Sequence, residues 1–537
     1  MSHFSIEETD VVIVGLGPAG LLASILLGQK GYKVIGFDRW PIPYALPRAV
    51  TFDHEIARIL ASIGINANND PTIDYHEDQY LWLNAKDEVL MEVDWLSTAD
   101  DGWRNRYWFS QPELEERLRG IASSLPNVDL RQGFEIFDFA QDGNGVTVGY
   151  KEVHVEGFLT VPTEGGKTGT AHAKFTVGSD GANSFLRRSV GYEFTDLQFY
   201  YDWTVVDVTP NVMPTYKTAH FQICDPARPT TVVPGGPGRR RWEFMVLPGE
   251  NPQELAKTEN AWKLLEPWGM TPETATLERS VAWRFQGKYL QDWRADRVLL
   301  VGDAAHLMPP FAGEGMCAAF RDVFNLAWRL DLVLQGTAGE DLLDEWSEER
   351  REQAKWYINF SVDLGRVICV TDPAEAALRD ERLKAEHAVQ SKIGPVQPHA
   401  AVLGHGTWNS DDALAGKPSF QGVVAYLGKT GRFDDAVGRG WFLITSVANA
   451  DEALSLAQLD AFARVGGRVL TVGARGTRAN VIDLEDTYAT WMAENSVHHI
   501  LVRPDYYVAV TAGSEAQLRS TFDLVMKQTV LATVVSA

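Results

Sequence analysis

Three glycines near the N-terminus are spaced as a phosphate-binding turn requires. Gly15, Gly17 and Gly20 follow a β-branched run at 11–14 and precede an apolar helix that we expect at 21–29. Glycines at these positions allow a tight turn, close approach of the backbone to a pyrophosphate, and close packing of helix on strand. The free N–H groups at the start of such a helix favour bound phosphate. The spacing therefore predicts a dinucleotide site, for FAD or for NAD(P).

Acidic residues follow three of the predicted strands. Asp38 ends a strand expected at 32–37, about 20 residues beyond the glycines, where it would accept hydrogen bonds from a ribose. Asp180 lies in Gly178-Ser179-Asp180-Gly181, which follows a strand and precedes a helix opened by Asn183 or Ser184. Asp303 follows a strand at 297–301 and could bond a ribityl hydroxyl. The helix expected at 317–334 would then direct N–H groups at the edge of a flavin ring.

The elements that carry these residues indicate an α/β protein of two or three domains, because 537 residues exceed one core. The stretch 199–283 has β-branched runs separated by turn residues and predicts an antiparallel sheet inserted between the parts of the first domain. Residues 340 to about 390 are expected to be helical. A linker-like segment follows at 394–407, and 415–537 predict a small α/β domain.

Composition excludes several classes of function. The net charge of −23 disfavours nucleic acid and anionic membranes as partners. The three cysteines, Cys224, Cys317 and Cys369, lie far apart, so neither a disulfide framework nor a metal site is expected. Because we find no signal peptide and no apolar run of about 18 residues, we expect a cytoplasmic protein.

Three motifs follow one another along the chain: the Gly15 fingerprint, Gly178-Ser179-Asp180-Gly181, and Gly302-Asp303-Ala304-Ala305-His306 with Pro309-Pro310. Together they resemble the motifs of the single-component FAD-dependent aromatic hydroxylases, which have the para-hydroxybenzoate hydroxylase fold. The segment 222–250, with Arg241-Trp242-Glu243-Phe244, is most similar to the 3-(3-hydroxyphenyl)propionate hydroxylases. The tail resembles the thioredoxin-like domain of that branch and of phenol hydroxylase, but it lacks the Cys-x-x-Cys.

The resemblance implies three domains. A Rossmann-like FAD-binding domain would comprise 1–75, 108–190 and 284–390. A substrate-binding β-sheet domain would comprise 76–107 and 191–283, and 391–537 would form the linker and the thioredoxin-like C-terminal domain, which could mediate a homodimer.

The resemblance also implies the chemistry. NADH or NADPH would reduce FAD, O2 would form the C4a-hydroperoxide, and a phenol would be hydroxylated ortho to its hydroxyl. The substrate would be similar to 3-(3-hydroxyphenyl)propionate, or would be a larger polyketide-type phenol. The implied cofactor-binding residues are Gly15, Gly17, Gly20, Asp38, Arg39, Arg48, Gln111, Asp180, Gly302, Asp303, Pro310, Gly313, Gly315 and Met316.

Three residues invite separate hypotheses. A base should help to deprotonate the phenol, and the candidates are His220 and Tyr216, near a strand of the inserted sheet. Glu314 departs from the family pattern, which has a small residue there. Its carboxylate would either oppose negative charge on the reduced flavin or face solvent.

Four other classes share some of these motifs. A flavin-dependent halogenase is disfavoured, because no Trp-x-Trp-x-Ile-Pro segment is present. An NAD-dependent dehydrogenase would have no role for Gly302-Asp303. A flavin oxidase or quinone reductase and a non-catalytic flavoprotein remain open.

Overall fold

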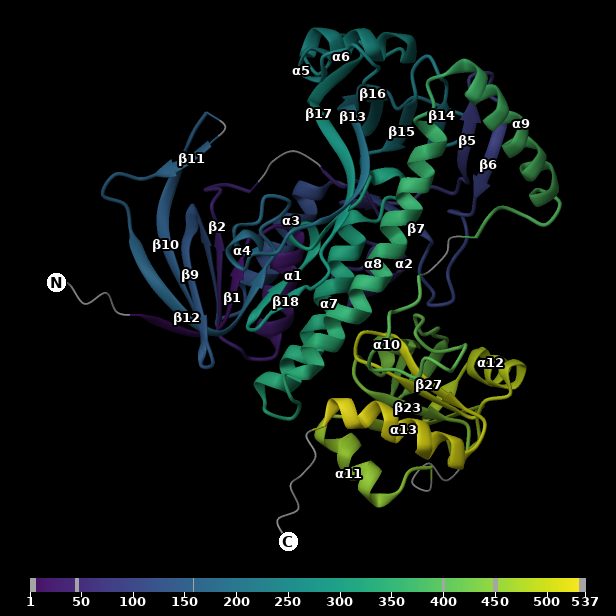
Figure 1. Ribbon diagram of the computed structural model, residues 1–537. Coiled ribbons are helices and arrows are strands. Elements are labelled where there is room, and N and C mark those ends of the chain that lie inside the picture. Colours follow the sequence, from purple (N-terminus) through teal and green to yellow (C-terminus); the bar gives the residue numbers. More distant parts are fainter. Residues whose placement is uncertain (1–5, 44–47, 158, 398–400, 448–452, 531–537) are drawn as a thin grey trace.

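The computed structural model describes residues 6–43, 48–157, 159–397, 401–447 and 453–530 (Figure 1). Within these residues the strands form sheets of nine, eight, seven and three strands. Both larger sheets and the three-stranded sheet lie before residue 310, and the seven-stranded sheet forms the C-terminal part. None of the described helices is both long and apolar enough to cross a membrane.

The nine-stranded sheet contains the N-terminal fingerprint. Strands β19, β12, β1, β2 and β8 are neighbours in that order and are all parallel. The end of β1 is fully buried, as expected for a parallel strand covered on both faces. The strands of this sheet are β1 Glu7–Val14, β2 Val34–Asp38, β8 Val128–Gln132, β9 Phe134–Asp142, β10 Gly145–Glu156, β11 Leu159–Pro162, β12 Thr168–Gly178, β18 Arg294–Ala295 and β19 Val298–Leu300.

The eight-stranded sheet runs in the order β20-β17-β13-β16-β15-β14-β5-β6. It joins strands from three separate segments of the chain, including β5 and β6, which precede the rest by more than a hundred residues. Its strands are β5 Tyr80–Asn84, β6 Val89–Val93, β13 Thr195–Pro210, β14 Phe221–Cys224, β15 Thr230–Pro234, β16 Arg240–Met245, β17 Ala275–Tyr289 and β20 His306–Leu307. The small sheet contains β3 Thr51–Asp53, β4 Ile73–Asp74 and β7 Arg106–Phe109.

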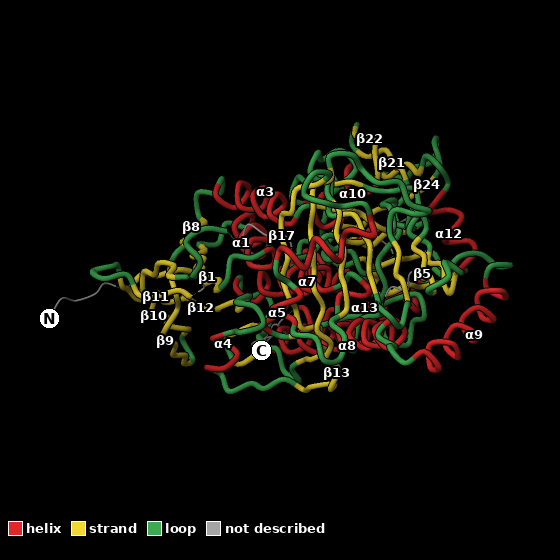
Figure 2. Tube along the Cα trace, turned by 90° about the horizontal axis from the view of Figure 1, so that it is seen from above, coloured by secondary structure: helices red, strands yellow, loops and turns green. Residues whose placement is uncertain are grey.

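Helices α7 and α8 lie between the two larger sheets. Seen from above, the N-terminal strands occupy one end of the molecule, β5 and α9 the other, and α7 the middle (Figure 2). The helices before the C-terminal part are α1 Pro18–Gln29, α2 His54–Ser62, α3 Gln111–Ser123, α4 Phe185–Ser189, α5 Pro252–Leu255, α6 Thr258–Leu265, α7 Gly315–Leu334, α8 Asp341–Ile368 and α9 Pro373–Gln390, with 3-10 turns η1 Glu266–Trp268, η2 Gly302–Ala304 and η3 Pro310–Ala312.

The C-terminal part has its own sheet and core. Strand β23 is parallel to β24 and antiparallel to β26, which is antiparallel to β27. Four short strands that the sequence did not predict, β21, β22, β25 and β26, complete this sheet. The elements are β21 Val423–Tyr426, β22 Lys429–Arg432, α10 Phe433–Ala436, β23 Phe442–Thr445, α11 Leu456–Arg464, β24 Arg468–Gly473, β25 Val481–Asp483, α12 Thr487–Asn495, β26 His499–Val502, β27 Val508–Ala512 and α13 Glu515–Thr529.

Candidate active site

The glycine turn joins β1 to α1. Gly15 has a φ of 95°, and its carbonyl accepts a hydrogen bond from the Ser179 hydroxyl at 2.7 Å. A Cβ on Gly20 would collide with that same carbonyl. At Gly17 the nearest atom of the described residues to an added Cβ is Nη2 of Arg48, 3.8 Å away, so the described residues do not crowd this glycine. The turn therefore leaves room for a ligand at the start of α1, as a pyrophosphate requires.

The acids predicted beside this turn make local hydrogen bonds. Asp38 accepts from the backbone N–H of Leu16 and of Trp40, both at 2.8 Å. Asp180 accepts from the N–H of Phe185 at 2.6 Å and so caps α4. Its other oxygen, Oδ1, is buried without a hydrogen-bond partner among the described residues, and burial raises the pKa of the Asp180 carboxyl. Both carboxylates retain acceptor capacity for a ligand hydroxyl.

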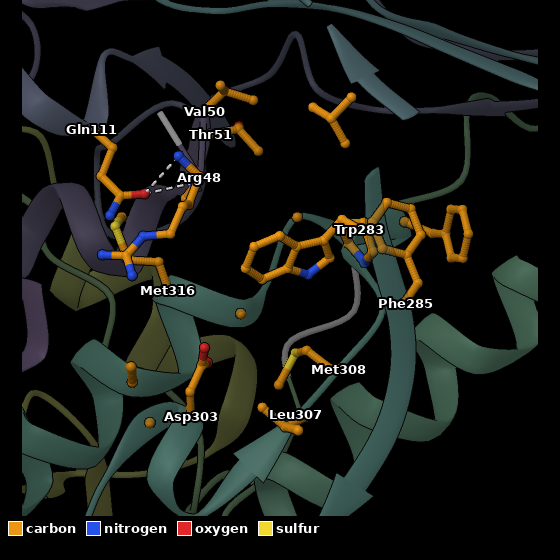
Figure 3. A pocket seen from close by; sticks show the side chains of 18 of the residues that line it. Arg48, Val50, Thr51, Gln111, Trp283, Phe285, Asp303, Leu307, Met308 and Met316 are labelled. Atoms are coloured by element: carbon orange, nitrogen blue, oxygen red, sulfur yellow. Dashed lines mark hydrogen bonds between the residues drawn. The ribbon is translucent and has the colours of Figure 1, made fainter. Parts of the chain in front are cut away.

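A cavity of about 330 Å³ lies between the nine-stranded and eight-stranded sheets. Figure 3 shows Arg48, Gln111 and Met316 on one side of it, and Trp283 and Phe285 on another. The Gln111 Oε1 accepts from the N–H of Ala49 at 2.7 Å and of Arg48 at 3.2 Å, which fixes the chain before β3. Nine of the predicted cofactor residues line this cavity: Gly17, Arg48, Gln111, Gly302, Asp303, Pro310, Gly313, Gly315 and Met316.

The other five predicted cofactor residues do not line it. They are Gly15, Gly20, Asp38, Arg39 and Asp180. Arg39 is exposed, with its guanidinium 5.5 Å from the centre of the Trp40 ring. Gly15 and Gly20 shape the turn itself, as described above.

Asp303 lies on η2, and its side chain is accessible from the cavity. The surrounding protein partly desolvates this carboxyl and so raises its pKa, whereas Arg48 and His306 lower it. A carboxylate in this position can accept hydrogen bonds from a ligand hydroxyl. The nearby residues Pro310, Gly313 and Gly315 form a rim that leads directly into α7.

Aromatic side chains line the part of the cavity next to the eight-stranded sheet. The rings of Tyr80 and Trp95 stack with centroids 3.9 Å apart, and Trp108, Trp283 and Phe285 extend this wall. Polar side chains interrupt the apolar surface on three adjacent strands. The uncharged and acidic ones, which the sequence did not assign to the site, are Gln222, Thr231 and Glu243; the cations Arg241, on the same strand as Glu243, and Arg279 also line the cavity.

The geometry does not support either predicted base. His220 lies outside the cavity, behind the rings of Trp95 and Trp108, and its Nε2 is 2.9 Å from the carbonyl of Asp78. Burial lowers its pKa to about 3, so the imidazole is neutral at physiological pH. Tyr216 packs against Phe221, on the face of the sheet opposite Gln222, because successive residues of a strand point to opposite faces.

Glu314 does not face solvent. It is buried and pairs with Arg106 at 3.2 Å and with Arg321 at 3.0 Å. Arg321 also binds Asp53 and Glu55. Asp53, Glu314 and Cys317 are close enough to hold a metal ion, but the Arg321 guanidinium already supplies the cation for both carboxylates. Arg106 and Arg321 therefore offset the negative charge of the Glu314 carboxylate.

Comparisons with known proteins agree with this geometry. Residues 8–361 match the model of a family described as an FAD binding domain, and residues 416–527 match one described as the HcaD C-terminal domain. A probable NADH-specific resorcinol 4-hydroxylase of Rhodococcus jostii (strain RHA1) is 33% identical over 95% of this chain and 93% of its own. A 3-(3-hydroxy-phenyl)propionate/3-hydroxycinnamic acid hydroxylase of Escherichia coli (strain SMS-3-5 / SECEC) is 31% identical over 94% and 92%.

Two solved structures share the fold over the whole chain. The flavin-dependent monooxygenase PieE, solved in complex with FAD and substrate, has a TM-score of 0.78 at 20% identity and covers 97% of this chain and 99% of its own. Aklavinone-11 hydroxylase, in a ternary complex with FAD and aklavinone, has a TM-score of 0.75 at 23% identity, with coverages of 98% and 99%.

Proposed function

The chain belongs to the family of FAD-dependent aromatic hydroxylases, and from this premise we propose that it uses NADH to hydroxylate a small phenol. The single observation that carries the proposal is the shared cavity. Asp303 and Gln111 approach it from the side of the glycine turn, and Trp283 and Phe285 approach it from the eight-stranded sheet. A cofactor and an aromatic substrate would meet there.

The proposed FAD site follows the described groups. The turn at Gly15 to Gly20 would hold the pyrophosphate, Asp38 the adenosine ribose, and Asp303 the ribityl chain. The rim at Gly313 and Gly315 would lie along the flavin ring, beside the N-terminus of α7, whose positive end favours developing negative charge. Bound FAD would supply hydride acceptance and oxygen activation. The chain's part is to orient both reactants and to exclude water.

We propose the domain division accordingly. The nine-stranded sheet with α1 and α7 would form the FAD-binding domain, and the eight-stranded sheet would form the substrate-binding domain. The end of β17 and the strand β20, which the sequence assigned to the FAD-binding domain, would then belong to the substrate-binding domain. The order β24-β23-β26-β27, with one parallel and two antiparallel pairs, supports a thioredoxin-like assignment for the C-terminal domain. Since its strands lack a Cys-x-x-Cys, the role we assign to this domain is structural.

The test is a coupled assay on the purified FAD-loaded protein. NADH and NADPH oxidation would be recorded in air with resorcinol, 3-(3-hydroxyphenyl)propionate and a polycyclic phenol, while hydroxylated product and H2O2 are quantified. We expect one phenol to stimulate NADH oxidation with product formed in proportion. Slow oxidation that ignores every phenol and yields only H2O2 would contradict the proposed function.

A further inference from the structure

The polar side chains in the aromatic half of the cavity form a row across the sheet. Gln222 on β14 pairs with Thr231 on β15, and Thr231 pairs with Glu243 on β16. Directly opposed residues of antiparallel strands have neighbouring side chains on the same face. All three residues line the cavity, so a molecule on this face of the sheet would meet them together.

The hydrogen bonds along this row leave its last member available. The Thr231 hydroxyl donates to Oε1 of Gln222 at 2.6 Å, and Nε2 of Gln222 donates to the Tyr80 hydroxyl at 2.6 Å. Glu243 accepts no hydrogen bond within the described part of the chain. Its nearest cation, Nη1 of Arg241, is 3.8 Å from Oε1, which is beyond hydrogen-bond distance.

The neighbouring cation is committed elsewhere. Arg241 donates from Nε to Oδ1 of Asp207 at 2.6 Å and from Nη2 to Oδ2 at 3.1 Å, and its Nη1 donates to the carbonyl of Arg48 at 2.6 Å. Arg279 also approaches Asp207, at 3.9 Å. Asp207 therefore forms the bidentate ion pair with Arg241, and Glu243 is left as a buried carboxylate open to the cavity.

Other proton acceptors at the cavity are placed differently. Among the described residues, the Asp, Glu and His side chains that line it are Glu243, Asp303 and His306. Asp303 lies on η2, on the side of the glycine turn. His306 is buried with its Nε2 2.8 Å from Asp322. Glu243 is thus the acid that projects from the eight-stranded sheet.

We propose that Glu243 is a catalytic residue that binds the hydroxyl of the phenol and accepts its proton. The O–H bond breaks, the proton moves to a carboxylate oxygen of Glu243, and the electron pair stays on the phenolate oxygen. That charge enriches the ring carbons ortho to the oxygen, where hydroxylation is proposed. This inference rests on the proposed function and names the base that neither His220 nor Tyr216 supplies.

The electrostatics of the site suit this role. Burial raises the pKa of Glu243 to about 7, with Asp207 acting in the same direction, whereas Arg241 and Arg279 lower it. A base with a pKa near the working pH is ionised in a large fraction of molecules and still holds a proton well. The product-forming rate should therefore rise with pH through about 7.

The experiment compares the FAD-loaded wild type with Glu243→Gln, which keeps the shape and loses the base. We expect the rate of product formation to fall about 100-fold and its rise near pH 7 to disappear. The affinity for resorcinol, followed by the change in the flavin spectrum, should lose its dependence on pH in the same range. Glu243→Asp should retain both pH dependences at a reduced rate.

Glu278→Gln is the matched control, because Glu278 lies on β17, pairs with Arg239 and does not line the cavity. We expect it to behave as the wild type. If Glu243→Gln matches the wild type in rate and pH profile, the role of Glu243 is refuted while the hydroxylase stands. Absence of any ionisation near pH 7 in the wild type also refutes it, whether or not the variant loads FAD. Failure of the wild type on every phenol refutes the proposed function instead.

Discussion

Replacing Glu349 with glutamine should loosen the attachment of the C-terminal domain. Glu349 lies on α8 and is completely buried. Arg329 of α7 approaches it at 2.8 Å, and Arg503, which follows β26, binds it through two nitrogens at 2.9 Å each. The backbone N–H of Thr407 donates to it at 2.6 Å. One carboxylate therefore joins both helices to the C-terminal part of the chain.

The expected loss of stability is large. Removing one partner of a buried ion pair leaves an uncompensated charge and costs about 3–5 kcal/mol. The pKa of Glu349 gives a similar free energy. Although burial raises this pKa, Arg329 and Arg503 lower it to about 2. The difference from the ordinary value of 4.5 corresponds to about 3 kcal/mol of differential stabilisation of the ionised form.

Thermal and urea unfolding of Glu349→Gln would test this value. One kcal/mol lowers the Tm of a domain of 150–250 residues by about 2–4 °C, so we expect a decrease of at least about 6 °C. Glu352→Gln on the same helix is the control. Glu352 is 41% exposed at its side chain and pairs only at the surface with Arg351 and Lys355, so its loss should cost at most about 1 kcal/mol. Equal unfolding midpoints for the two variants would refute the reasoning.

Three further predictions concern the cofactor site and acid stability. Gly17→Val should abolish FAD binding and leave the apoprotein folded, because Gly17 has an extended backbone and an added Cβ comes no closer than 3.8 Å to any atom of the described residues. A yellow, fully loaded variant would contradict this. Asp303→Ala should raise the Kd for FAD by about 10- to 100-fold, the loss of a hydrogen bond to a charged group, and a fluorescence titration with an unchanged Kd would contradict the assignment. Glu349 has a lowered pKa in the folded state, so its contribution is complete above about pH 4.5 and is lost as the pH falls toward 2. Urea titrations at several pH values should show this loss in the wild type and a smaller one in Glu349→Gln.

The N-terminal strand, turn and helix were predictable because the residue preferences of each element agree with its place in the fold. The β-branched strand, the glycine turn and the apolar helix of 21–29 reappear as β1 and α1, although α1 begins at Pro18. Proline is tolerated in the first helical turn, where its missing N–H has no partner to lose. The short strands β21, β22, β25 and β26 were not predicted, because each spans only three or four residues and carries little periodicity.

The polar row in the aromatic half of the cavity was harder to predict from the sequence. Which face a strand residue occupies depends on register, and a shift of one residue exchanges the two faces. Tyr216 and Gln222 are close in sequence yet lie on opposite faces of the eight-stranded sheet. A signal was nevertheless present: Gln222, Thr231 and Glu243 are buried polar residues within short, largely buried strands. Buried polar residues are informative because they require a partner, which a substrate can provide.

The position of Glu314 could not be inferred locally either, because its partners come from distant parts of the chain. Arg106 reaches it from β7 and Arg321 from α7, and Arg321 also binds Glu55 of α2. The hydroxyl of Tyr507, in the C-terminal domain, donates to Glu55 at 2.8 Å. A buried carboxylate on the rim of the cavity is thus tolerated because two arginines neutralise it. The same arginine that binds it extends the contact network to the C-terminal domain, so that domain helps to hold the rim against which we place the flavin.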